Sequence, residues 1–159
     1  MLREFKAGIG KVVHTDYKAN SAMKTGMVVV LDENTKEAKF PAAPTADGLY
    51  FVDKERVPTG YNTARGDMSD YDENFINVEA GEFVKLKNYR EDAVIGVDCK
   101  GSAAPTAGNV VAAGTDGKLI DAPDTVPSRY LYLGDVLDNG HTLMKIKVLD
   151  APIKNSVVG

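Results

Sequence analysis

The stretch that decides the fold is residues 25–40, which read TGMVVVLDENTKEAKF. It holds an apolar, β-branched run at 27–31, residues of turn type at 32–35, and a second short run at 37–40. Branched apolar side chains favour strands, while Asp, Asn and Thr favour turns. The stretch therefore predicts a β-hairpin, and the aromatic run at 49–52 predicts a third strand after a proline-containing loop.

The same pattern returns later in the chain. Residues 107–135 align with residues 25–53 at a constant offset of 82, and eight of these 29 positions are identical. The identities are Gly26/Gly108, Val28/Val110, Val29/Val111, Lys36/Lys118, Pro41/Pro123, Leu49/Leu131, Tyr50/Tyr132 and Asp53/Asp135. The two segments are expected to form similar β-hairpin units. The alternative is that unrelated hairpins simply look alike.

A second similarity extends this prediction. Residues 81–87 (GEFVKLK) resemble residues 140–147 (GHTLMKIK), with one residue inserted. Each begins at a glycine and continues in strand-like alternation. We therefore expect a small β-barrel or sandwich at 25–148, built from related units 25–100 and 101–148. Asp116-Gly117 and Asn139-Gly140 predict two-residue hairpin turns with positive φ, and only 54–57 and 136–137 could form brief helical turns.

Three segments lie outside the repeated pattern. Residues 1–24 contain Gly8 and Gly10, which disfavour a helix, and are expected to form an extended arm or a first strand. Residues 54–80 form an insertion present only in the first unit, with an Asp-rich centre expected to lie in solvent or at a partner surface. Residues 149–159 form a C-terminal tail that either lies across its own domain or reaches a neighbour.

Composition excludes several classes. The 159 residues are 43% hydrophobic and 26% charged, with 15 Gly and 7 Pro, which is typical of a globular chain with many turns. A net charge of −4 argues against nucleic acid as a partner. No apolar stretch is long enough to predict a membrane span. The single Cys99 cannot form an internal disulfide, which fits synthesis in a reducing cytoplasm.

No catalytic, cofactor or metal constellation is apparent, so we expect a chain that is not an enzyme. His14 and His141 have no sequence neighbours that would complete a nucleophile dyad or a zinc site. The acidic run at 67–73 lacks the glycine and the final glutamate of a calcium loop. Tyr130 and Tyr132 fall on one face of their strand, as core or interface residues do.

The string at 107–118 (AGNVVAAGTDGK), with its partner at 25–36, resembles head decoration (capsid cement) proteins of tailed bacteriophages. Glycine-bounded hairpins and acidic composition are shared features. The resemblance spans roughly residues 25–148. It implies a structural virion protein, made in the host cytoplasm, that binds the capsid exterior and ties major capsid subunits together without cofactor or catalysis. Many members form trimers, so a homo-oligomer is also expected.

Attachment is expected to use apolar side chains near the two ends of the chain. These candidates are Leu2, Phe5, Ile9, Ile153, Val157 and Val158. Deleting the first ten residues or residues 151–159 should then leave a folded protein that binds shells less well. Two rival hypotheses remain: a small-molecule or carbohydrate-binding β-barrel that uses Tyr50, Tyr130 and Tyr132, and a β-rich hydrolase with carboxylates Asp67, Asp70 and Asp72 in the insertion.

Overall fold

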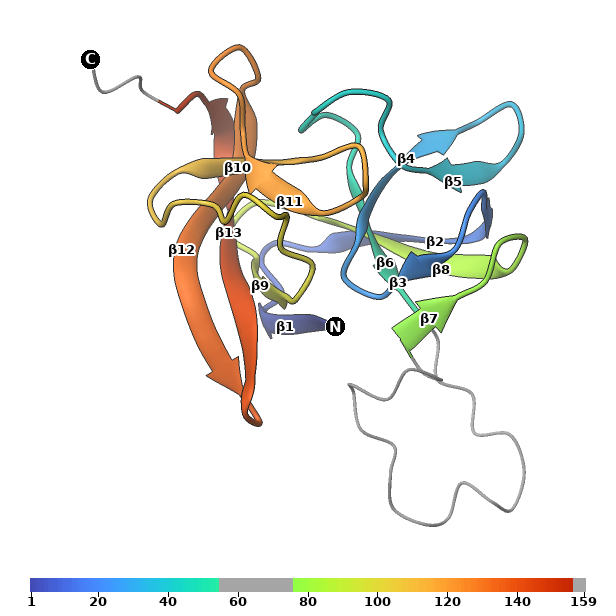
Figure 1. Ribbon diagram of the computed structural model, residues 1–159, viewed down its shortest axis with the longest axis horizontal. Helices are drawn as coiled ribbons and strands as arrows, with labels where there is room; N and C mark the ends of the chain where they lie inside the picture. Colours follow the sequence, from blue (N-terminus) through green and yellow to red (C-terminus); the bar gives the residue numbers. More distant parts are fainter. Residues whose placement is uncertain (55–75, 156–159) are drawn as a thin grey trace.

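The computed structural model describes residues 1–54 and 76–155, and every named element within them is a β-strand (Figure 1). The all-β prediction is confirmed. The strands are β1 (Leu2–Lys6), β2 (Lys11–Ala19), β3 (Met23–Lys24), β4 (Val28–Asp32), β5 (Glu37–Lys39), β6 (Tyr50–Asp53), β7 (Asn77–Val78), β8 (Phe83–Tyr89), β9 (Val94–Val97), β10 (Val110–Ala113), β11 (Leu119–Asp121), β12 (Ser128–Asp138) and β13 (His141–Ile153).

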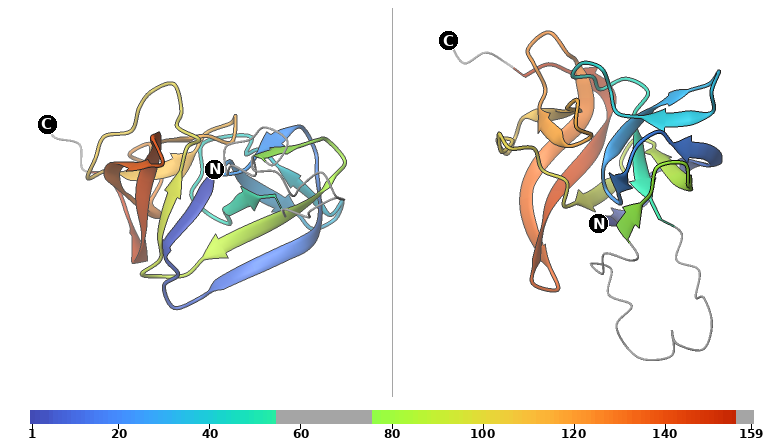
Figure 2. Two further views of the ribbon diagram at one scale, coloured as in Figure 1. Left: turned by 90° about the horizontal axis from the view of Figure 1, so that it is seen from below. Right: turned by 45° about the vertical axis from the view of Figure 1, so that its right-hand side comes forward.

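The strands form a barrel and a sheet that lie side by side (Figure 2). The barrel is closed in the order β2-β5-β4-β6-β8. The six-stranded sheet has the order β1-β9-β13-β12-β10-β11, and β3 and β7 form a separate two-stranded pair. A closed barrel leaves no unpaired strand edge, so the open edges among the named strands lie in the six-stranded sheet and in the β3–β7 pair.

The barrel and the sheet contain the same five-strand arrangement. In the barrel, β4 lies between β5 and β6, and β8 links β6 to β2. In the sheet, β10 lies between β11 and β12, and β13 links β12 to β9. All of these pairings are antiparallel. We call residues 11–89 unit 1 and residues 94–153 unit 2.

Individual registers and hydrogen bonds match between the units. Val28 pairs with Phe51, and Val110 pairs with Leu131. The amide of Gly26 donates to the carbonyl of Val52 at 2.8 Å, as that of Gly108 does to Tyr132 at 2.8 Å. Both glycines have positive φ, +97° and +94°. This left-handed conformation favours glycine, which explains why both units carry one there.

The contact that closes the barrel is also present in unit 2. Asn20 donates its backbone N–H to the carbonyl of Ala38 at 3.0 Å, where β2 and β5 run parallel. In unit 2 the amide of Gly101 donates to the carbonyl of Leu119 at 2.8 Å, beside a parallel bridge from Lys100 to Leu119. The predicted relationship between the two hairpin segments therefore extends to all five strands.

The constant offset of 82 holds for β4 and β10 and is wrong beyond them. The pairings equate β5 with β11 at an offset of 81 and β6 with β12 at an offset of 80, because the connections in unit 2 are shorter. Tyr50 therefore corresponds to Tyr130, and its match with Tyr132 is not a structural equivalence. The similarity between 81–87 and 140–147 does hold, since Val52 pairs with Leu86 as Tyr132 pairs with Ile146.

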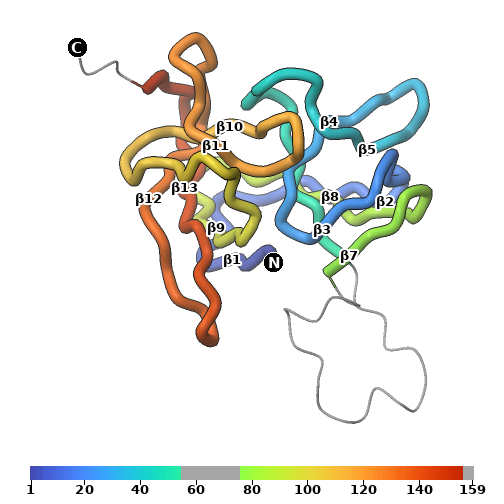
Figure 3. The backbone as a smooth tube through the Cα atoms, viewed as in Figure 1, coloured from blue at the N-terminus to red at the C-terminus, as the bar shows by residue number. Residues whose placement is uncertain are grey.

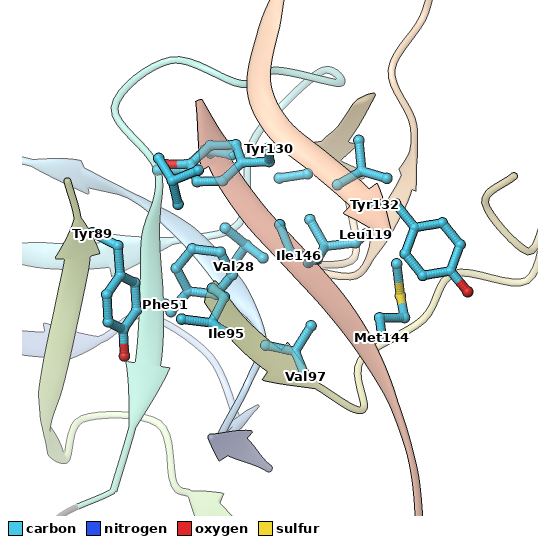
Figure 4. Close-up of a cluster of buried hydrophobic side chains, with 14 of the residues drawn as sticks. Val28, Phe51, Tyr89, Ile95, Val97, Leu119, Tyr130, Tyr132, Met144 and Ile146 are labelled. Carbon is cyan, nitrogen blue, oxygen red and sulfur yellow. The ribbon is translucent and has the colours of Figure 1, made fainter. Parts of the chain in front are cut away.

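One hydrophobic core joins the two units (Figure 4). Its buried residues include Val28, Phe51 and Tyr89 from unit 1 and Tyr130 and Ile146 from unit 2. The ring of Phe51 meets the rings of Tyr89 and Tyr130 edge to face, at centroid distances of 5.8 and 5.7 Å. Each buried side chain of this size stabilises the fold by about 1.5–3 kcal/mol. The units therefore form one domain.

The flanking segments differ from the predicted boundaries. Of the two alternatives for residues 1–24, an extended arm or a first strand, the structure has strands: β1 pairs with β9, and β2 is a strand of the barrel. The sheets also divide the chain elsewhere than at residue 100, because β9 belongs to unit 2 and β2 to unit 1. Residues 149–153 continue β13, so a separate tail begins only at Lys154. The centre of the insertion 54–80 lies outside the described residues.

Two local predictions are corrected. Asn139 and Gly140 have φ of +49° and +82°, which confirms the predicted two-residue turn between β12 and β13. Asp116-Gly117 is different, because only Gly117 has positive φ and the loop closes from Gly114 to Lys118. Residues 136–137 are extended in β12 and do not form a helical turn, since cross-strand pairing with β13 overrides local propensity.

Candidate protein-interaction surfaces

The longest pair of strands, β12 and β13, extends beyond the rest of the sheet. The pairs Val136–Leu143, Leu137–Thr142 and Asp138–His141 adjoin no third strand in the described part of the chain. Figures 1 and 3 show this hairpin projecting past β1 and β9. We call residues 134–145 the ribbon. Its outer part is a projection that a partner can contact.

Charged side chains hold the ribbon to the body of the protein. Asp135 accepts hydrogen bonds from the Lys100 ammonium at 2.9 Å and from the Tyr132 hydroxyl at 2.5 Å. The hydrogen bond from Lys100 is the main reason that the pKa of Asp135 is lowered. Farther out, Asp138 forms an ion pair with Arg3 of β1 at 3.4 Å. These contacts fix the direction in which the ribbon projects.

The outer part of the ribbon exposes apolar surface. Leu137 is 74% exposed, and Leu133, one residue before the ribbon, is 45% exposed. Leu143 on the paired strand is fully buried, next to Gly96 and close to the ring of Phe5. The ribbon is therefore packed on one side and presents Leu137 to solvent. Leu137 is not among the residues that the sequence predicts for attachment, although the predicted Asn139-Gly140 turn between two apolar runs is the signal for a hairpin here.

A second exposed apolar residue, Ile9, lies in the turn between β1 and β2 and is 71% exposed. Backbone hydrogen bonds fix this turn against the β8–β9 turn: Ile9 donates to the carbonyl of Glu91 at 3.2 Å, and Arg90 donates to that of Gly10 at 3.0 Å. Gly8 lies so close to Ala93 and Glu91 that a side chain there would clash with their backbone. Ile9 is thus accessible on a fixed turn, as a residue that binds a partner must be.

The other N-terminal candidates are less accessible. Leu2 is half-buried and packs against the shared core, so its apolar surface already has intramolecular contacts. Phe5 is 42% exposed, with its ring over Gly96 and the Lys145 ammonium 5.9 Å from its centroid. A side chain on Gly96 would overlap the Phe5 ring. Both residues are therefore parts of the folded sheet.

The C-terminal candidates separate into two groups. Ile153 ends β13, pairs with Ser128 and is 47% exposed. Ile9 and Leu149 border one depression, so the structure brings Ile9 close to the strand that ends in Ile153. Val157 and Val158 lie outside the described residues. Asn155 is bound to the backbone of Val110 and Ala122, so the tail lies across its own domain at least to that point.

A charged cluster lies between β1 and the barrel. The Glu4 carboxylate accepts hydrogen bonds from Lys11 at 2.7 Å, Lys87 at 3.0 Å and the Tyr89 hydroxyl at 2.9 Å. Burial by itself would raise the pKa of Glu4, but these donors lower it to about 2. Because all three donors are bonded to the one carboxylate, the cluster joins the sheet to the barrel and does not resemble a reactive site.

Cys99, Tyr130 and Tyr132 are all buried. Burial, with a further contribution from the Asp98 charge, raises the pKa of the Cys99 thiol to about 12, which keeps it a poor nucleophile. Tyr130 and Tyr132 are 5% and 4% exposed, so their rings are unavailable for stacking on a sugar. Asp67, Asp70 and Asp72 lie outside the described residues. Across residues 1–54 and 76–155, no cluster of three or more His, Cys, Asp or Glu could hold a metal ion.

Helices that could span a membrane are absent from the described part of the chain. No family model, curated protein or solved structure matches this sequence.

Proposed function

We propose that this protein is a structural component of a virion, which binds the outer surface of a bacteriophage capsid and stabilises contacts between major capsid subunits. The observation that carries the proposal is the ribbon, a projecting hairpin held by Lys100 and Arg3 that presents Leu137 at 74% exposure. An exposed leucine on a fixed projection is a feature of attachment elements, because burying it against a partner gains free energy without a large ordering cost.

The resemblance of the two glycine-bounded hairpins to capsid decoration proteins supports the same proposal. So does the finding that both hairpins belong to complete five-strand units in one domain. A protein on a shell binds a repeating surface, so modest contacts made by each copy add together across the lattice. Specific attachment typically buries about 1,200–2,000 Å² in total, which one ribbon and the adjoining sheet surface could supply together. Synthesis in the host cytoplasm, before the shell matures, belongs to the proposal.

The assay is co-sedimentation of purified protein with shells assembled from the major capsid protein that is encoded alongside it. Leu137→Asp should weaken binding at least about tenfold, because a charge replaces a side chain buried at the joint. Phe83→Asp is the matched control, since Phe83 is 67% exposed on the barrel, away from the ribbon. Phe83→Asp should bind like wild type.

Two outcomes would contradict the proposal. If wild-type protein does not sediment with shells, the function is different, and a search for ligands that raise the melting temperature is the next step. If both variants bind as wild type does, the ribbon is not the attachment element.

A further inference from the structure

The surface around Ile9 has a distribution of charge that fits a second copy of the same chain. Ile9 stands between two shallow depressions and contributes to both, as does Glu91. One depression is also lined by Lys11, Arg90 and Arg129. The other is lined by Asp92, Lys147 and Asp150. One side of Ile9 is thus predominantly basic and the other predominantly acidic.

Several of these charges form no ion pair within the described part of the chain. Lys11 is bonded to Glu4, and Asp92 lies 3.6 Å from both Lys6 and Lys147. In contrast, no ion pair joins Arg90, Glu91, Arg129 or Asp150 to another of the described residues. Two cations and two anions that are free of such pairs therefore border one exposed isoleucine.

The backbone beneath this surface is firmly held. The turns that carry Ile9 and Arg90 are bonded to each other through Ile9, Gly10 and Glu91. Arg129 donates from Nε to the carbonyl of Leu149 at 2.8 Å, which holds its guanidinium between the two depressions. Asp150 is on β13, two residues after Val148. The carbonyl of Val148 accepts a hydrogen bond from the backbone N–H of Asp92 at 2.9 Å. The charges are therefore presented in a fixed arrangement, with little ordering cost on association.

We propose that two copies of this chain associate through this surface about a two-fold axis near Ile9. In an isologous interface the same patch is used by both subunits, so it must be complementary to itself. A patch that is basic on one side and acidic on the other meets this condition, because the rotation places Arg90 of one copy near Asp150 of the second. The two Ile9 side chains bury each other at the centre.

Sedimentation equilibrium tests the association without any shell, so its outcome is independent of the proposed function. Wild-type protein should approach twice 17.1 kDa as concentration rises. Added salt should weaken the dimer, since the paired charges are near solvent. Ile9→Asp should raise the dissociation constant at least about tenfold. Phe83→Asp, which alters a residue of similar exposure on the barrel, should leave it unchanged.

A charge exchange tests the two-fold arrangement directly. Arg90→Glu alone and Asp150→Lys alone should each be monomeric, because both contacts across the axis become repulsive. An equimolar mixture of the two variants should form a heterodimer, since the carboxylate introduced at position 90 of one copy then faces the ammonium introduced at position 150 of the other. The proposal is overturned if wild-type protein is monomeric at all concentrations, if it forms a trimer, or if the mixture stays monomeric while both variants remain folded by circular dichroism.

Discussion

The side-chain amide of Asn155 binds both polar groups of the Val110 backbone. Its Oδ1 accepts the Val110 N–H at 2.7 Å, and its Nδ2 donates to the Val110 carbonyl at 3.0 Å and to the Ala122 carbonyl at 2.9 Å. In unit 1 the equivalent N–H, that of Val28, donates to the carbonyl of Gly117 in unit 2. The Asn155 side chain thus accepts, in unit 2, the hydrogen bond that in unit 1 is accepted by a backbone carbonyl of the other unit.

Asn155→Ala should destabilise the protein by about 1–3 kcal/mol, because Val110 is buried and its N–H would lose its partner, while its carbonyl would keep only the hydrogen bond from the Ala122 N–H. Chemical denaturation measures the change. Lys154→Ala, at an exposed neighbouring position, should change stability by less than about 0.5 kcal/mol. Equal effects of the two substitutions would show that the Asn155 contact contributes nothing.

The two equivalent glycines should differ in their tolerance of a side chain. Gly108→Ala places a methyl group in open space, so its cost is mainly the strain of a positive φ, about 1–2 kcal/mol. Gly26→Ala has the same strain and also overlaps the carbonyl oxygen of Met1. Thermal unfolding should rank Gly26→Ala as clearly less stable. The opposite ranking would show that the N-terminus moves aside.

Stability should decline in acid through Glu4. The pKa of Glu4 is about 2 in the folded protein and 4.5 in its usual state, so its charge stabilises the fold fully above about pH 5. That contribution is lost as the pH falls from 4.5 through 2. Glu4→Gln should therefore lower the free energy of unfolding by on the order of 1–2 kcal/mol at neutral pH, a modest amount because partial exposure weakens the ion pairs. Near pH 2 the substitution should cost almost nothing, because Glu4 is then largely protonated. A pH-independent cost would contradict this.

Removing the first ten residues should be harmful to folding, contrary to the expectation from sequence. The deletion removes β1, exposes the edge of β9 and leaves Lys87 and Tyr89 without Glu4. Thermal unfolding followed by circular dichroism should show a large drop in melting temperature. Phe5→Ser, which keeps the strand and changes only a 42% exposed ring, should have a much smaller effect. Equal melting temperatures for the deletion and wild type would show that β1 is dispensable.

The strands are predictable where local pattern and tertiary pairing agree. The apolar run at 27–31 and the Asn139-Gly140 turn are examples, because branched apolar residues and positive-φ turn residues have few alternatives. A single alignment offset does not hold along the whole unit, because the loops between strands are shorter in unit 2. The identity of Tyr50 and Tyr132 in the sequence does not reveal this difference in loop length. The strand at 136–137 escapes prediction because it depends on Leu143 and Thr142, which lie across the hairpin.

The candidate surfaces are predictable only in part. Ile9 stands out in the sequence because it is apolar and lies between glycines. Its charged surroundings come from Arg90, Arg129 and Asp150, which only the fold brings together. From the sequence, Leu2 is predicted to bind a partner protein. The structure instead pairs its strand with Val97, about 95 residues away, and nothing in the first 24 residues reveals this pairing.

This pairing of Leu2 with Val97 has a consequence during synthesis. A ribosome that adds about 5–20 residues per second needs roughly 5–20 seconds to make the residues between them. Throughout this time all of β2 to β8 is made, and the barrel can close, while β1 still has no strand to join. Strand β1 is thus made long before its partner and is among the last elements to pair, and its apolar side chains are open to chaperones in the interval.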